Sequence, residues 1–206
     1  DKETDISAAS LSVKVGYNND PVEYQGLAHF LEHMLFMGTK KYPDENYYHK
    51  TITETGGMAN AHTMADNTTY YFQTVNKHFE KCLDLFAQFF IEPLFKKDSI
   101  DREINAVNSE YNKNITNEII REASILKSYI TNNHPYYNFG VGNKSTLDKP
   151  DIRKVLLEFY DKYYSANQMK LVILANKKMK DHIIKIFSKV KNKNVKHETI
   201  NFLPFT

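Results

Sequence analysis

The sequence predicts a single α+β domain, in which a mostly antiparallel, mixed β-sheet is packed by helices. Segments with a two-residue alternation of apolar and polar side chains are separated by segments whose apolar side chains recur three and four residues apart. Two of the strand segments, 58–63 and 67–75, are close enough for a hairpin, whereas the first and last strand segments need crossovers. With 206 residues the chain is long enough to bury a core.

The strands are indicated by alternation and by residue type. Leu11, Val13 and Val15 alternate with polar neighbours, and residues 67–75 are dense in aromatic and β-branched side chains. The elements expected in chain order are strand 8–17, helix 26–36, helix 44–55, strands 58–63 and 67–75, helix 78–91, helix 98–114 with further helical sequence to about 131, loop 134–150, helix 151–163, strand 169–175 and helix 180–190.

The helices are bounded by start and stop signals. Gly38 follows the first helix, Pro93 ends the helix at 78–91, and Asp98 is expected to cap the helix that follows. We expect residues 1–190 to form the domain and residues 191–206 to be a linker toward a second domain that this chain lacks.

Composition excludes several classes of function. Lys and Arg number 27 against 25 Asp and Glu, a net charge of +2, which gives no electrostatic reason to expect nucleic acid as a partner. No apolar run is long enough to cross a membrane, so no membrane partner is expected. One cysteine favours a reducing compartment, the cytoplasm first. Because the chain begins at Asp1 rather than at a methionine, an organellar location stays open.

A candidate metal site lies within the first predicted helix. His29, Glu32 and His33 form an H-x-x-E-H arrangement and span about 100° of the helix, opposite its apolar stripe. Histidines at positions i and i+4 can place two nitrogens on one zinc ion, with the glutamate beside the open coordination position. The alternative is a solvent-exposed polar face that happens to contain two histidines.

A catalytic zinc ion needs a third protein ligand. Glu103 and Glu110 are seven residues apart in a later helix and so lie within about 20° of each other on one face. Both border the apolar stripe of that helix, where carboxylates are commonly ion-paired or reach to solvent. The residues alone therefore leave the third ligand open.

The motifs resemble those of the pitrilysin and insulin-degrading enzyme family of inverzincin zinc metallopeptidases. The similarity extends in family order across nearly all of residues 8–176. It is carried by residues 26–46 (GLAHFLEHMLFMGTKKYPDEN), 56–61 (GGMANA), 67–72 (NTTYYF), 102–110 (REINAVNSE), 134–139 (HPYYNF), 142–144 (GNK) and 163–169 (YYSANQM).

The resemblance implies a fold of the pitrilysin and mitochondrial processing peptidase type and a role for each matching residue. It implies that His29, His33 and Glu110 bind one Zn²⁺ ion and that Glu32 is the general base of peptide-bond hydrolysis. Glu103 would support the site. Asn60 and Ala61 match edge-strand residues that bind the backbone of an oligopeptide or small unfolded substrate, which would add a strand there.

Two positions depart from the family pattern. His62 stands where insulin-degrading enzymes have an aromatic residue in the substrate pocket, and Leu31 replaces a cysteine that some of them have. Members of the family have four homologous domains, and arginine and tyrosine side chains from the C-terminal half complete the site. We therefore expect the remaining domains as partners, and little activity from this chain alone.

Two alternative functions stay open. One is a noncatalytic structural or peptide-binding subunit of the same fold, which occurs where family members lose the motif. The more remote one is a metal enzyme similar to S-ribosylhomocysteine lyase, which shares H-x-x-E-H but uses a cysteine as third ligand. The only cysteine, Cys82, lies on the apolar face of its predicted helix, as a core residue would.

Overall fold

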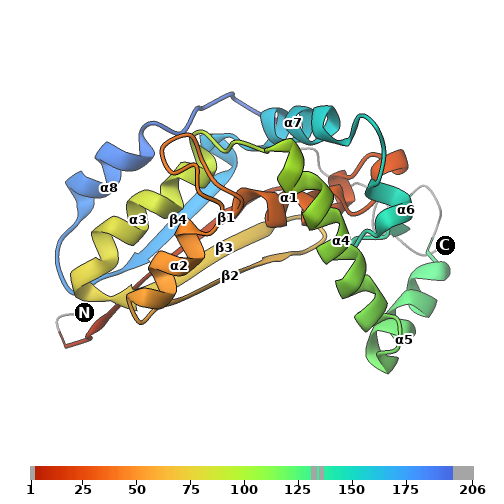
Figure 1. The fold of residues 1–206 in the computed structure, drawn as a ribbon, viewed down its shortest axis with the longest axis horizontal. Helices are drawn as coiled ribbons and strands as arrows, with labels where there is room; N and C mark the ends of the chain where they lie inside the picture. Colours follow the sequence, from red (N-terminus) through yellow and green to blue (C-terminus); the bar gives the residue numbers. More distant parts are fainter. Residues whose placement is uncertain (1–2, 131–133, 135–136, 197–206) are drawn as a thin grey trace.

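The computed structural model describes residues 3–130, 134 and 137–196. Its centre is a four-stranded sheet in the order β2-β3-β1-β4 (Figure 1). The strands are β1 (Ile6–Val13), β2 (Met58–Thr63), β3 (Thr68–Val75) and β4 (Met169–Leu174). The α+β class is confirmed, and every pair of neighbouring strands in the described residues is antiparallel, so this sheet is antiparallel rather than mixed.

One face of the sheet is buried and the other is open. Leu11 of β1 pairs with Tyr70 of β3 and with Leu171 of β4, and Ala61 of β2 pairs with Tyr70 from the other side. These side chains share the face on which the helices pack. Side chains alternate between the two faces along a strand. The polar residues that alternate with these apolar ones in the sequence therefore lie on the open face.

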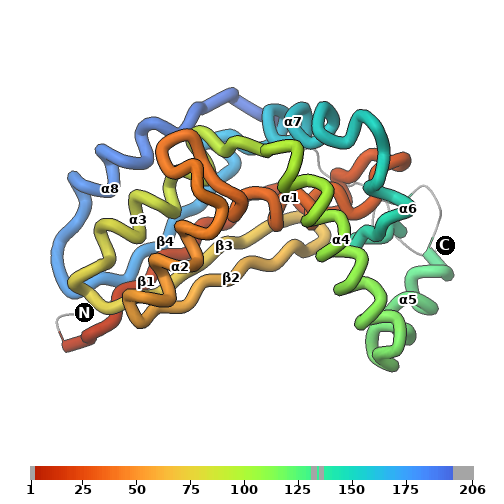
Figure 2. Tube along the Cα trace, in the orientation of Figure 1, coloured from red at the N-terminus to blue at the C-terminus, as the bar shows by residue number. Residues whose placement is uncertain are grey.

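The helices α1, α2 and α3 pack on this buried face, and α8 packs beside α3 (Figures 1 and 2). The helices are α1 (Leu27–Leu35), α2 (Tyr47–Glu54), α3 (Phe79–Ala87), α4 (Lys97–Asn114), α5 (Glu118–Ser128), α6 (Lys144–Leu147), α7 (Ile152–Tyr163) and α8 (Lys180–Phe187). Figure 2 shows α4 leading away from the sheet to α5, at the opposite end of the molecule from α8. No described helix is long and apolar enough to cross a membrane.

Aromatic side chains fill the core between sheet and helices. Phe72 of β3 stacks on Phe79, and Phe86 contacts Phe72 and Phe89 with ring centroids 5.2 and 5.8 Å apart. Burying each of these side chains contributes about 1.5–3 kcal/mol. Cys82 is fully buried beside them, as its place on the apolar face predicts.

Several element ends differ from the predictions. The first strand ends at Val13, because the Val15 amide donates to the Val13 carbonyl and turns the chain away. The second helix begins only at Tyr47, because Asp44 accepts the Asn46 amide in a turn.

The predicted capping residue Asp98 is wrong. The residue that precedes α4 is Lys96, whose backbone is extended, and Asp98 lies inside the first turn. The helical sequence beyond 114 is interrupted by Asn117, whose side chain accepts the Ile119 amide and caps α5. The predicted loop 134–150 contains the short helix α6, which Asn143 caps.

The proposed end of the domain at residue 190 stays a prediction. Residues 191–195 lie against the turn before β4: the Ala166 amide donates to the Lys191 carbonyl, and the Lys193 amide donates to Ser165 Oγ. Residues 197–206 of the predicted linker lie outside the described residues.

Candidate metal centre

Helix α1 presents its polar face to α4 rather than to solvent. The side chains of His29 and His33 are 13% and 24% exposed, and Glu32 is 8% exposed. The apolar side chains Phe30, Leu31 and Met34 on the opposite side are fully buried in the core. The alternative of a solvent-exposed polar face therefore does not fit the structure.

The start of α1 is fixed by a residue that the sequence analysis did not identify. Asp20 accepts the Gly26 amide at 2.7 Å and the Ala28 amide at 2.8 Å, so a buried carboxyl group caps the helix from six residues upstream of its N-cap. Burial raises the pKa of Asp20 to about 8, against the opposing effect of these amide hydrogen bonds. Gly26 has φ of 88° and lies so close to Gly142 that a Cβ atom would be 2.2 Å from the Gly142 Cα. These contacts fix where α1, and with it His29, begins.

Helix α4 brings its two glutamates to the two histidines. Glu110 Oε2 lies 3.5 Å from Nε2 of His29 and 3.6 Å from Nε2 of His33. One ligand atom from each of the three residues lies within 4.8 Å of the others. A tetrahedral zinc ion with ligands at about 2.0–2.1 Å holds them about 3.3–3.4 Å apart, so the two distances from Glu110 are already close to those of a zinc site.

The other ring nitrogen of each histidine is already engaged. His33 Nδ1 lies 3.1 Å from Glu103 Oε2, and His29 Nδ1 lies 2.7 Å from the Val141 carbonyl oxygen. Since a carbonyl oxygen only accepts, His29 carries its proton on Nδ1 and turns the lone pair of Nε2 toward Glu110. This arrangement, in which an outer partner orients each imidazole, is typical of metal-binding histidines.

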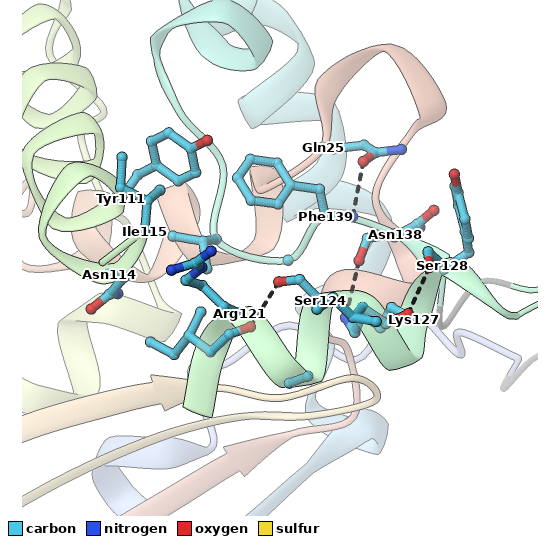
Figure 3. A pocket seen from close by; sticks show the side chains of 16 residues that line it. Gln25, Tyr111, Asn114, Ile115, Arg121, Ser124, Lys127, Ser128, Asn138 and Phe139 are labelled. Carbon is cyan, nitrogen blue, oxygen red and sulfur yellow. Dashed lines mark hydrogen bonds between the residues drawn. The ribbon is translucent and has the colours of Figure 1, made fainter. Parts of the chain in front are cut away.

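Val141 follows residues 138–139, which hydrogen bonds hold in place. Figure 3 shows these residues in the wall of a neighbouring cavity. The Phe139 amide donates to Gln25 Oε1, and Lys127 Nζ of α5 donates to the Asn138 carbonyl (Figure 3). That cavity, of about 730 Å³ between α4, α5 and residues 137–141, shares Lys127 and Val141 with the cavity around the histidines.

The carboxylates change the protonation of this cluster. Burial alone would lower the pKa of His33, but its hydrogen bond with Glu103 and the nearby Glu110 carboxylate outweigh burial and raise that pKa to about 9. The close contact with His33 lowers the pKa of Glu110, against the opposing effect of burial. Without a metal ion, the cluster therefore holds a proton on His33 at neutral pH.

Glu32 stands apart from this trio and has a partner of its own. Thr63 Oγ1, at the end of β2, donates to Glu32 Oε2 at 2.6 Å. The carboxylate lines the same cavity as His29, His33 and Glu110, a space of about 550 Å³. A carboxylate held beside two imidazoles and open space can accept a proton from water in that space.

Strand β2 forms one wall of this cavity. Asn60, Ala61 and His62 all line it. In the described residues β2 pairs only with β3, so its other edge is free. The Ala61 amide donates to Asn60 Oδ1 within β2 rather than to β3, so a backbone donor faces the free edge. The structure thus brings every predicted site residue to one cavity or directly beside it.

Four residues of the site were missed from the sequence. Val141 contacts a histidine ring 112 positions away, and Asp20 accepts amides six and eight residues downstream, farther than a capping pattern reaches, so no local pattern marks either. Thr63 follows the predicted peptide-binding residues on the same strand, and its place on the core face of β2 was the one available signal. Lys127 lies over the ring of Tyr17, 4.3 Å from the ring centroid, and both residues line the cavity.

The chain is similar to a set of known peptidases. A family model described as Insulinase (Peptidase family M16) matches residues 1–149. Human insulin-degrading enzyme is 45% identical over 204 residues, which cover 95% of this chain and 20% of that protein. A Schizosaccharomyces pombe protein that carries the words "zinc protease" in its name is 46% identical over 204 residues, 95% of this chain and 21% of its own length.

The crystal structure of pitrilysin has the same fold. It matches with a TM-score of 0.95 and 38% identity, covering all of this chain and 23% of the pitrilysin chain. The chain thus spans about a fifth of the length of the curated relatives it matches.

Proposed function

The chain belongs to the insulinase family of peptidases, M16, and on this basis we propose that it is the catalytic zinc-binding domain of a metalloendopeptidase. The proposed substrates are oligopeptides or small unfolded polypeptides. The observation that carries the proposal is the position of Glu110 Oε2, 3.5 and 3.6 Å from the Nε2 atoms of His29 and His33. Both Nδ1 atoms have other partners, so both Nε2 atoms are oriented for one metal ion.

His29, His33 and Glu110 are the proposed zinc ligands. Two imidazoles and one carboxylate are the donor set of many catalytic zinc sites, which keep a fourth position for water. A zinc ion bound there would polarise the scissile carbonyl group and make water more acidic. Glu103 would keep His33 in its metal-binding orientation through Nδ1.

Glu32 is the proposed general base. Its carboxylate takes a proton from the attacking water and then delivers it to the nitrogen of the leaving amine, so one group serves both steps. Because Glu32 is 8% exposed, bulk water competes little for this proton.

The free edge of β2 is the proposed site for the substrate backbone. An extended peptide would add there as a strand, displacing the Asn60 side chain from the Ala61 amide. The exposed His62 would contact a substrate side chain. Only a segment without its own regular structure can add in this way, which is the reason for proposing unfolded substrates.

The two alternatives are less well supported. A noncatalytic subunit would not need Glu32 beside the ligand trio, and this chain has it. A lyase with a cysteine ligand does not fit, because Cys82 is fully buried in the core and its Sγ atom lies 3.8 Å from Thr55 Oγ1.

The proposal is tested by cleavage of an internally quenched peptide by the zinc-loaded protein. Protein in excess over peptide makes slow hydrolysis measurable. Glu32→Gln should abolish cleavage but retain zinc, whereas Glu54→Gln, an exposed position on α2, should cleave like the wild type. Undiminished cleavage by Glu32→Gln would refute the role of Glu32 as base, and a zinc-loaded full-length enzyme that cleaves no peptide would favour the noncatalytic alternative.

A further inference from the structure

Thr63 and Glu32 join the two walls of the cavity. Thr63 is the last residue of β2 and Glu32 lies on α1, and the bond from Thr63 Oγ1 to Glu32 Oε2 is 2.6 Å long. Among the described residues, Thr63 is the only side chain that donates a hydrogen bond to Glu32. The orientation of this buried carboxylate therefore depends on one hydroxyl group.

A carboxylate needs such a contact to stay in one orientation. The terminal torsion of a glutamate side chain is broad, so its two oxygens otherwise exchange places and rotate freely. A hydrogen bond that holds Oε2 leaves Oε1 as the acceptor for water. Reaction rates depend strongly on this kind of alignment, and small displacements of a reacting group reduce them by large factors.

The Thr63 hydroxyl is itself held in place at the closed end of the β2-β3 hairpin. Thr63 pairs with Thr68 across the hairpin, and the Met64 amide donates to the Asn67 carbonyl at 2.8 Å. Thr68 Oγ1 donates its proton to the Val15 carbonyl at 2.9 Å. The Thr63 proton is thus directed to Glu32, while the neighbouring hydroxyl proton has an acceptor of its own.

On the basis of the proposed function, on which this role depends, we infer that Thr63 is a positioning residue that holds Glu32 for proton transfer. Asn60 and Ala61 lie on the same strand, so β2 carries both the peptide-binding edge and the contact that orients the base. One rigid element then sets the distance between the peptide backbone and Glu32.

The test compares Thr63→Val, which removes the donor at nearly constant volume, with Thr63→Ser, which keeps it. Thr74→Val is the matched control, because Thr74 is buried in the same hairpin and its hydroxyl donates to the Thr55 carbonyl, away from the cavity. Zinc content, melting temperature, the maximal single-turnover rate of peptide cleavage and the half-saturating protein concentration are measured for each.

Thr63→Val should lower the maximal rate about 10-fold or more without changing half-saturation or zinc content, because the base is disordered while the binding edge is intact. Thr63→Ser should recover most of the rate, and Thr74→Val should lose stability but not rate. A crystal structure of zinc-loaded Thr63→Val should show Glu32 displaced or in several rotamers.

The outcomes separate this role from the proposed function itself. If Glu32→Gln is inactive but Thr63→Val cleaves at the wild-type rate, Thr63 is not a positioning residue, and the proposed peptidase function still stands. Equal loss in Thr63→Val and Thr63→Ser would mean that packing, not the hydroxyl, matters. A single unchanged position of Glu32 in the variant crystal would also overturn the inference, even where cleavage is too slow to compare.

Discussion

Glu103 Oε2 lies 3.1 Å from Nδ1 of His33, although the two residues are 70 positions apart in the chain. The contact joins α4 to α1 behind the proposed metal site. It holds the Nδ1 side of His33 against Glu103 and leaves Nε2 turned toward Glu110. The ligand geometry on α1 is therefore a property of the α1–α4 pair, not of α1 alone.

Replacing Glu103 should weaken zinc binding without removing a ligand. We expect Glu103→Leu to raise the zinc dissociation constant about 10- to 100-fold, the usual cost of losing the partner that orients a ligand. Glu103→Gln keeps an acceptor and should lose less. The measurement is competition with a chromophoric chelator, with Asp101→Ala on the exposed side of α4 as control. Wild-type affinity in Glu103→Leu would contradict this role.

Zinc affinity should increase with pH. In the metal-free protein the pKa of His33 is raised to about 9, so between pH 7 and 9 a proton must leave as zinc binds. The apparent affinity should rise up to about tenfold per pH unit in this range and level off above pH 9. The pKa of Glu110 is lowered, so this residue stays ionised and adds nothing to the slope.

The same shift affects the stability of the metal-free protein in the opposite sense. A histidine whose pKa is raised on folding stabilises the fold fully below its unfolded pKa of about 6.5, and this contribution is lost as pH rises through 9. Chelator competition and urea unfolding from pH 6.5 to 10 measure both slopes. An affinity independent of pH between 7 and 9 would show that His33 does not hold this proton.

Gly26→Ala should be far more damaging than a comparable change elsewhere. A Cβ atom at Gly26 would lie 2.2 Å from the Gly142 Cα, and its φ of 88° is already unfavourable for alanine. Gly56→Ala is the matched control. Gly56 also has a positive φ, of 66°, but a Cβ atom added there would lie 4.0 Å from its nearest neighbour, a Val75 side-chain carbon.

We expect Gly56→Ala to lower the free energy of unfolding by about 1 kcal/mol, the backbone cost alone. Gly26→Ala should lose at least twice that and should bind zinc less tightly, because moving Gly142 also moves the Val141 carbonyl from His29. Similar losses in the two variants, measured by urea unfolding, would mean that the contact between Gly26 and Gly142 does not fix the start of α1.

The sequence was most informative where the relevant geometry is local. The spacing of His29, Glu32 and His33 predicts one helix face, and the structure has these residues on one face of α1. The seven-residue spacing placed Glu103 and Glu110 on one side of α4, but it could not tell which of them faces both Nε2 atoms. That assignment came from the resemblance, because it depends on how α4 crosses α1.

The missed residues act over longer distances in the chain. Val141 meets His29 across 112 positions, and Thr63 meets Glu32 across 31, so no periodicity links the partners. The capping prediction for α4 was wrong by two residues: Asp98 is a good capping residue, yet the chain enters the helix at Lys96, and no side-chain hydrogen bond caps it there.

The most direct test is the zinc content of the purified chain, because binding by His29, His33 and Glu110 is the central claim. Elemental analysis after equilibration with zinc and removal of the excess should give about one zinc ion per wild-type chain. Glu110→Gln should retain far less under the same conditions, and Glu54→Gln should match the wild type. A wild-type chain without stoichiometric zinc, or a Glu110→Gln variant that retains it equally, would contradict the account.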